Sequence, residues 1–588
     1  MIKINFLNQL RKLNKLSFLP SDKLLTLLII FAIIVNSYGL FSNILASNDS
    51  NFYSIVAKHI ILSGDWVNLT FAGVDWLDKP HLPFWLTALS YKFFGINPFA
   101  YILPGFIFHI LGAVFTYLLG RYLYDNKIGL IACLFYVSAV HLMISSIDVR
   151  AEAYLLGEIT PASYFWLLYH DKSKFRWLVL GAIFSALAIM TKGVFVLITI
   201  TSGVIAILFY QKKLRALFSL KWLTAFLLTF LLISPELICL YLQFDLHPEK
   251  VIFNHDNVSG IKFFFWDSQF GRFFNNGPIT SGSKNASSHY LFFVHTFLWS
   301  FLPWTIFFIA ALIRYIKLRP YNESNSVLIE NYSRDYFLLS SFIITFILFS
   351  ITRFQLDYYI NILIPYASII TAKWVFDAIT SKSNHYLLFH IQNTIATIIV
   401  VTVLIFSFLV LSGAEFVTIV LVCVLTISAF IVLINNRNAI KAIIYPLLSI
   451  LVAFIFVTLV NNSIYIRYDA GYQIASYLAK KPFETVIDYN VNLLSLEFNY
   501  DKFYERKQTI PQLESVDMPY YLVIKDSDWD QIASKFPNAR LLNKFIWIPQ
   551  EKFISTLLNV KKRDAATITL LLLEVKPIPL FATNFIGY

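Results

Sequence analysis

Apolar runs of about 20 residues recur along this chain, and short polar stretches separate them. A helix of about 20 apolar residues is long enough to cross a bilayer, so the pattern predicts about thirteen membrane spans. The first run is longer than the apolar core of a signal peptide, which favours a retained anchor. The predicted spans lie near residues 24–45, 98–120, 128–146, 152–169, 177–191, 193–210, 222–243, 290–313, 335–352, 358–378, 385–411, 414–434 and 442–461.

The connections between these runs alternate in character. One set is basic and comprises "GRYLYDNK", "HDKSKFR", "QKKLR", "RYIKLRP", "DAITSKSNH" and "NNRNAIK". Because Lys and Arg collect in cytoplasmic loops, this set predicts the cytoplasmic side and a cytoplasmic N-terminus. The opposite, external side carries the long segments 46–97 and 244–289. An odd number of spans then places the C-terminal residues outside.

The pattern changes after residue 463. Short runs typical of strands ("ETVIDYN", "PYYLVIK", "ITLLLLEV") alternate with stretches of helical spacing ("GYQIASYLAKK", "DSDWDQIASKF"). Alternating elements of this kind predict a small α/β domain. The predicted fold class is therefore an all-α polytopic membrane domain over residues 1–463, followed by an external α/β domain over 464–588.

The composition supports this fold class and excludes a large soluble protein. The chain of 588 residues is 57% hydrophobic and only 14% charged, whereas soluble domains carry about a quarter charged residues. The net charge of +12 is explained by the basic loops and indicates no nucleic-acid partner. Cys133, Cys239 and Cys423 all lie in apolar runs, which indicates neither a disulfide framework nor a zinc site.

Ionisable residues gather on the external side, beginning with "NDSNFYSIVAKHI". Its apolar residues at helical spacing predict a helix on the bilayer surface. They are Phe52, Ile55, Val56 and Ile60. Asp49 and Tyr53 are four residues apart and so share a helix face. A functional role is not the only explanation for an acid at this position, because acids are also favoured electrostatically at helix N-termini.

Further charges come from later external turns. In "SSIDVRAEAYLLG", Asp148 and Glu152 are four residues apart, with Arg150 between them. Asp148 is typical of a solvated interfacial turn, whereas Glu152 lies deeper, where an ionisable group needs a partner or a function. Lys192 and Arg353 follow in other turns. Each cation alone is explained by snorkelling, but together these groups predict a cleft with carboxylates and cations.

Such a cleft suits a phosphate-linked substrate. Cations neutralise a phosphate, and carboxylates orient an attacking group or stabilise positive charge on a sugar carbon. The chain has no Gly-rich nucleotide-binding motif, which favours a lipid-linked donor over a nucleotide sugar. A transporter is less favoured, because no second half mirrors the first.

The segments "DSNFYSIVAKHIILSGDWV" and "LDKPHLPFWLTALSYKFFG" resemble the first external loop of bacterial lipid A aminoarabinose transferases. Together with protein O-mannosyltransferases, these enzymes belong to the GT-C class of membrane glycosyltransferases. "DVRAEAYLLG", "ALAIMTKG", "HYLFFVHTFLWSFLPWT" and "YYINILIPYASII" resemble later family segments in the same order. Ser50 and Phe52 depart from the family pattern, at positions where an acid and an Arg are common. The resemblance implies a bacterial inner-membrane protein whose C-terminal domain is periplasmic.

The resemblance also implies the reaction. One sugar, an amino sugar such as 4-amino-4-deoxy-arabinose or galactosamine, passes with inversion from an undecaprenyl phosphate donor to lipid A. The implied catalytic carboxylates are Asp49 and its partner Glu152. A phosphate leaving group needs positive charge and hydrogen bonds rather than a general acid. The implied phosphate-binding residues are Lys79, Tyr53, Arg150, Lys192 and Arg353. The segment "WDSQFGRFFNNG" is expected to form a lid over the donor.

Two alternatives stay open at this point. One is a protein O-mannosyltransferase-like enzyme that glycosylates periplasmic proteins, and the other is a flippase for lipid-linked sugars. A divalent metal is a further alternative, because four potential ligands lie in the first external loop. They are His59, His81, Asp75 and Asp78. Their spacing is not that of a known ligand set, so interfacial histidines without a metal are favoured.

Overall fold

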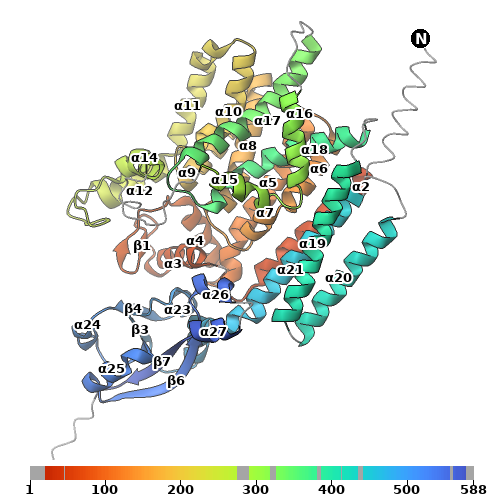
Figure 1. Cartoon of the computed structure of the whole chain (residues 1–588). Coiled ribbons are helices and arrows are strands. Elements are labelled where there is room, and N and C mark those ends of the chain that lie inside the picture. The colour runs from red at the N-terminus through yellow and green to blue at the C-terminus, as the bar shows by residue number, and fades with distance from the viewer. Residues whose placement is uncertain are drawn as a thin grey trace, which may run out of the picture.

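The computed structural model of the chain describes residues 20–45, 47–274, 290–317, 326–380, 386–411, 413–434, 441–556 and 560–577 (Figure 1). A large helical domain is joined at one end to a smaller α/β domain. Parts of the predictions lie outside these residues: the basic start before residue 20, the basic connections within 318–325, 381–385 and 435–440, and the end of the expected lid.

A helix occurs at each predicted span. The uninterrupted ones are α2 (Asp22–Ser37), α5 (Pro98–Leu123), α8 (Ala151–Lys172), α9 (Phe175–Lys192), α10 (Val196–Tyr210), α17 (Ser326–Ile351), α18 (Ile364–Thr380), α19 (Tyr386–Val410), α20 (Gly413–Ile434) and α21 (Lys441–Ser463). Others are divided: α6 (Asn126–Val137) from α7 (Val140–Ser145), α11 (Leu220–Leu232) from α12 (Ser234–Leu240), and α15 (Phe292–Ser300) from α16 (Thr305–Lys317).

Fewer helices than predicted are long and apolar enough to span a membrane by themselves. Among the described residues there are 7, or 8 if the bent pair α11 and α12 forms one span. Several predicted spans are short or divided in the described residues, such as α10 and the pair α6 and α7, and α8 carries several polar residues. The chain is thus a multi-span membrane protein, and the predicted number of spans stays a prediction.

Helix α8 lies at the centre of the membrane domain, where it is almost entirely buried among α5, α9 and α10. Its approach to α5 depends on Gly157, since a Cβ there would lie only 2.4 Å from the carbonyl oxygen of Phe108. Small residues allow this closeness in membrane helices, where van der Waals packing rather than water drives association.

The first external segment folds into α3 (Asn48–Ser63), a hairpin of β1 (Thr70–Phe71) and β2 (Val74–Asp75), and α4 (Leu82–Phe94). The prediction that the apolar face of α3 lies on the bilayer is wrong. Ile55, Val56 and Ile60 are fully buried in a cluster with side chains of α4 and α5. Protein, rather than lipid, therefore covers this face and fixes the helix in place.

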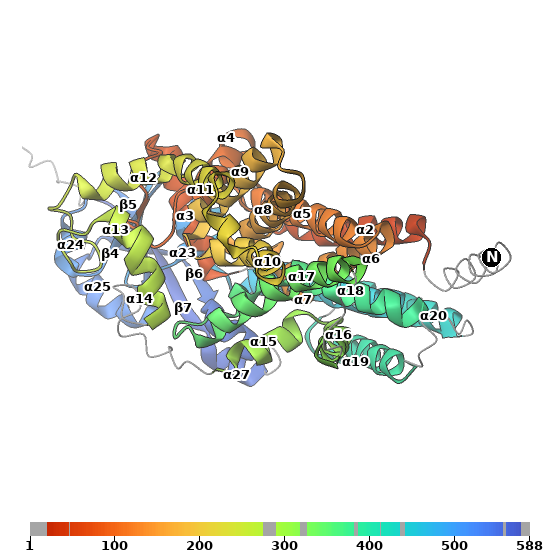
Figure 2. The same ribbon diagram turned by 90° about the horizontal axis from the view of Figure 1, so that it is seen from above.

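The predicted α/β domain is present after α21. A five-stranded sheet has the order β4-β3-β5-β7-β6, in which β3 is parallel to both β4 and β5, and β7 is antiparallel to β5 and β6. The strands are β3 (Thr485–Tyr489), β4 (Phe503–Lys507), β5 (Tyr520–Lys525), β6 (Ala539–Trp547) and β7 (Ile568–Val575). Helix α23 (Leu494–Asn499) of this domain lies beside α3, as Figures 1 and 2 both show.

Candidate active site

Asp49 is held at the start of α3 by an arginine. The Ser47 hydroxyl caps this helix by accepting from the Ser50 N–H at 3.1 Å, which places Asp49 in the first turn. The Arg150 guanidinium lies 2.8 Å from the Asp49 carboxylate and 4.3 Å from the centre of the Tyr358 ring. The Asp49 side chain is 43% exposed, so it is anchored on one side and open to a substrate on the other.

Arg150 also pairs with a second carboxylate, that of Asp148. A guanidinium nitrogen of Arg150 donates to it at 2.8 Å, the Ser50 hydroxyl donates at 2.6 Å, and the Ser47 hydroxyl donates as well. Its side chain is only 15% exposed. The interpretation of Asp148 as a solvated turn is therefore wrong: it lies inside the network that positions Arg150 and, through it, Asp49.

A second cluster joins Lys79 to Arg272. The Lys79 ammonium pairs with Asp78, and Arg272, from α14 (Ser268–Phe274), donates to the same carboxylate at 2.6 Å. Burial alone would raise the pKa of Asp78, but the charges of Lys79 and Arg272 and their hydrogen bonds outweigh it and lower that pKa to about 2. Two cations thus share one carboxylate, which leaves a net positive charge.

Tyr53 lies close enough to both Asp49 and Asp78 to be affected by their charges. Burial raises the pKa of its hydroxyl well above the ordinary value, and the charges of Asp78 and Asp49 raise it further. Its ring packs against Phe84, with the ring centres 5.2 Å apart. Tyr53 therefore stays a neutral phenol that can donate a hydrogen bond.

Glu152 pairs with Lys192 and not with Asp49. Their side chains are 1% and 4% exposed, and the Lys192 ammonium also lies 3.8 Å from the centre of the Tyr359 ring. Gly193, which ends α9 with a φ of 105°, lets the chain turn directly after the lysine. Because L side chains rarely adopt this φ, the "TKG" stretch needs its glycine.

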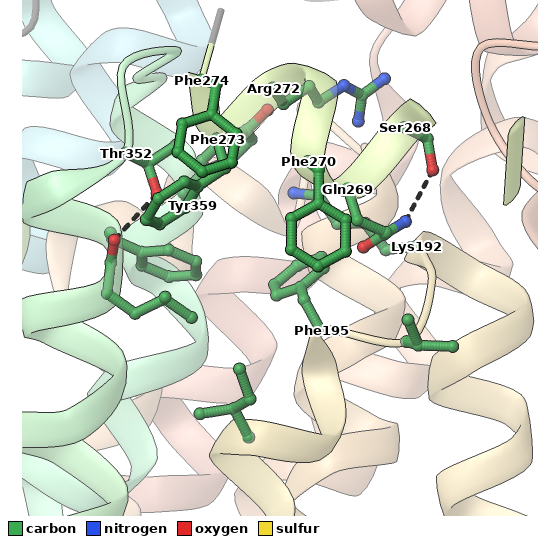
Figure 3. Close-up of a pocket in the computed structure, with 14 residues that line it drawn as sticks. Lys192, Phe195, Ser268, Gln269, Phe270, Arg272, Phe273, Phe274, Thr352 and Tyr359 are labelled. Carbon is green, nitrogen blue, oxygen red and sulfur yellow. Dashed lines mark hydrogen bonds between the residues drawn. The ribbon is translucent and has the colours of Figure 1, made fainter. Parts of the chain in front are cut away.

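An apolar cavity of about 400 Å³ opens beside these cations (Figure 3). Lys192 and Arg272 share its lining with phenylalanines and aliphatic side chains of α10, α14 and α17. The ring of Tyr359 also lines the cavity. A charged wall next to hydrocarbon walls is what the phosphate of a long-chain lipid requires.

Most of the residues predicted from the sequence are gathered here. Electrostatic interactions link Lys79 to Asp49, and Lys192 to Lys79 and Arg150. Arg353 is the exception: it is exposed, and its side chain pairs with no carboxylate in the described part of the chain.

Some site residues were missed by the sequence analysis. Arg272 lies within the expected lid and was not singled out, although an arginine between aromatic residues in an external segment is a usable signal. Tyr358 and Tyr359 stand at the start of a predicted span and were considered only as part of its motif.

The four potential metal ligands of the first loop do not form one centre. Asp75 lies 3.0 Å from Lys250, Asp78 binds two cations, and His59 lies 3.5 Å from Glu497 of the C-terminal domain. The described residues contain no group of three or more side chains placed to hold a metal ion. The alternative of a divalent metal bound by this set of residues loses its support.

His81 forms a buried pair with Glu236 of α12. One ring nitrogen lies 3.0 Å from the carboxylate and the other lies 2.9 Å from the carbonyl oxygen of Val67. Burial alone would lower the pKa of His81, but the charge of Glu236 and its hydrogen bond outweigh it and raise that pKa. Since the carbonyl can only accept, the ring is fully bonded in its protonated form.

Thermal stability is therefore expected to fall as the pH rises from 6 to 8.5. The folded protein holds the His81 proton more tightly than the unfolded chain, so the stabilisation is complete below about 6.5 and is lost as the pH rises through the raised pKa. Melting of the detergent-solubilised protein should show a smaller pH dependence in Glu236→Gln. An equal dependence in both proteins contradicts this assignment.

Comparison with known proteins supports the fold predicted from the sequence. The sequence model of the dolichyl-phosphate-mannose-protein mannosyltransferase family matches residues 78–239. The crystal structure of ArnT from Cupriavidus metallidurans bound to undecaprenyl phosphate aligns with a TM-score of 0.70 at 15% identity, over 94% of this chain and 98% of that one. This chain has the same GT-C fold as ArnT. The resemblance inferred from the sequence is confirmed.

Curated proteins with similar sequences include aminoarabinose transferases. An undecaprenyl phosphate-alpha-4-amino-4-deoxy-L-arabinose arabinosyl transferase 2 of Proteus mirabilis is 25% identical over 57% of this chain and 56% of its own length. The corresponding transferase of Pseudomonas aeruginosa (strain LESB58) is 23% identical over 48% of this chain and 50% of its own length. The chain thus matches these relatives over only about half of their length.

Proposed function

We propose that the protein is an inverting glycosyltransferase that moves one sugar from a polyprenyl phosphate donor to an acceptor at the external face of the membrane. The observation that carries this proposal is the meeting of Lys79, Arg272 and Lys192 beside an apolar cavity. The cations suit the donor phosphate, and the phenylalanine-rich walls suit its prenyl chain.

The phosphate is the leaving group in this reaction. When the acceptor oxygen forms a bond to the anomeric carbon, the bond from that carbon to the phosphate oxygen breaks on the opposite side. Lys79 and Arg272 stabilise the charge that develops on the departing phosphate, and the phenol of Tyr53 donates a hydrogen bond. Because these donors are fixed beforehand by Asp78 and by packing, little reorganisation accompanies the reaction.

Asp49 acts on the acceptor. If the acceptor is a hydroxyl, the carboxylate removes its proton as a general base, and if it is an ionised phosphate, the carboxylate and Arg150 orient it. Glu152 takes a different part from the one the family resemblance implied. Because it pairs with Lys192, we assign it the role of holding that lysine beside the cavity.

We further propose lipid A as the acceptor and an amino sugar as the group transferred. The support is the resemblance of the external motifs to lipid A aminoarabinose transferases and the names of the curated relatives, which refer to 4-amino-4-deoxy-L-arabinose. The corresponding location is the bacterial inner membrane, with the N-terminus in the cytoplasm and the C-terminal domain in the periplasm.

Mass spectrometry of lipid A tests this proposal in cells that carry the intact gene, its deletion or the Asp49→Asn variant. Loss of the mass of one sugar in both altered strains supports the acceptor and the reaction together. If lipid A is identical in the three strains, lipid A is not the acceptor. Loss of glycosylated periplasmic peptides in the deletion strain would then favour the protein O-mannosyltransferase-like alternative.

A further inference from the structure

A buried ammonium group joins α3 to the C-terminal domain. Lys58, on α3, is only 3% exposed. Its Nζ donates to the main-chain carbonyl oxygens of Glu497 at 2.6 Å and Phe498 at 3.2 Å, and a third hydrogen bond goes to that of Tyr500. The three donors of the ammonium are thus all used. Their acceptors lie at the end of α23, where helical carbonyls have no partner within the helix.

Neighbouring side chains strengthen the same junction. Glu497 lies 3.5 Å from the imidazole of His59 and also pairs with Arg506 of β4. The guanidinium of Arg506 lies 4.9 Å from the centre of the Phe71 ring. Phe71 belongs to the hairpin that leads to residues 78 and 79, so the C-terminal domain contacts both the helix that carries Asp49 and the hairpin that precedes Lys79.

We propose that Lys58 is a positioning residue for the transfer reaction, through which the C-terminal domain fixes α3 and thereby Asp49. Both residues belong to one uninterrupted helix, with Asp49 in its first turn and Lys58 nine residues later, roughly 13 Å along the axis. A helix of this length moves as a unit, so a shift at Lys58 reaches Asp49. The inference rests on the proposed function, because it assigns Asp49 its part there.

A purely structural role accounts for this lysine less well. Burial lowers the pKa of Lys58 to about 8, although the charges of Glu497 and Asp501 oppose that shift. The buried charge therefore costs folding free energy that an apolar side chain of similar size would not cost. What the ammonium adds is direction, since three carbonyls fix where its nitrogen lies.

The test uses the full-length protein in nanodiscs, with an undecaprenyl-phosphate-linked sugar as donor. In Lys58→Met we expect kcat to fall roughly ten-fold, with the KM for the donor unchanged within about two-fold. Amide exchange of residues 48–56 should accelerate in this variant. Lys58→Arg, which can still donate to the carbonyls, should recover most of the rate. The control is Lys92→Met, which removes an exposed lysine from α4 of the same loop.

The proposal is wrong if Lys58→Met has the wild-type kcat per folded protein and the wild-type rate of amide exchange at residues 48–56. This holds even if the variant is thermally less stable. If the wild-type protein transfers no sugar, the proposed function fails, and the exchange measurement still decides whether Lys58 orders the start of α3. If Lys58→Met cannot be purified, Lys58→Gln, which keeps two N–H donors without the charge, is assayed with the same criteria.

Discussion

The Asp49→Asn variant is expected to retain its donor but to lose transfer, with kcat lowered by at least about a hundred-fold. The amide keeps the size of the side chain but can neither take a proton nor complete the ion pair with Arg150 at 2.8 Å. Since the phosphate-binding cations belong to a different cluster, donor affinity should change little. The measurement is steady-state transfer by the reconstituted enzyme, alongside direct binding of undecaprenyl phosphate.

Asp256→Asn is the matched control for this variant, because it removes an exposed carboxylate from the second external segment. It should transfer sugar at the wild-type rate. If Asp49→Asn is as active as this control, the assignment of the leading carboxylate is wrong. If instead both variants lose activity while remaining folded, the effect reflects external negative charge in general.

Replacing Lys79 by Met is expected to weaken the binding of undecaprenyl phosphate by about ten- to a hundred-fold. The substitution removes one of two cations that share Asp78, so the remaining charge of Arg272 is largely neutralised. Removing the second cation as well, in Lys79→Met with Arg272→Gln, should leave binding too weak to measure. Titration calorimetry in detergent micelles gives the affinities.

Arg353→Gln provides the comparison, since the sequence placed Arg353 with the phosphate-binding residues while the structure leaves its side chain exposed. A change of less than about two-fold is expected, because an exposed charge is strongly screened. An effect as large as that of Lys79→Met would instead show that Arg353 contacts the phosphate and belongs to the binding site.

The sequence predicted what depends on local composition. Apolar runs are visible without any tertiary contact, and each predicted span coincides with helix. In the same way, Asp49, Tyr53 and Lys79 lie in one continuous external segment, so their proximity could be anticipated. The strands β3, β5 and β7 were found because they are buried apolar runs, whereas β4 ("FYERK") carries charges and β6 is a largely exposed edge strand.

What could not be predicted depends on which distant segments meet. The Glu152–Lys192 pair joins the start of one helix to the end of another, and Arg272 of α14 reaches Asp78 although the two residues are 194 positions apart. Asp148 looked solvated because the serines that cover it come from α3 and the residue before it. The burial of the apolar face of α3 was missed because periodicity alone does not distinguish a protein core from a bilayer.

Release of polyprenyl phosphate by the purified protein is the most direct test of the proposed transfer reaction. Proteoliposomes would receive an isotope-labelled undecaprenyl-phosphate-linked sugar and lipid A, and both products would be quantified by mass spectrometry. We expect one undecaprenyl phosphate to be released for each labelled sugar that becomes bound to the acceptor, and Asp49→Asn to form neither product. If the labelled donor only changes leaflet, with no phosphate released and no new glycosidic bond, the protein is a flippase and not a glycosyltransferase.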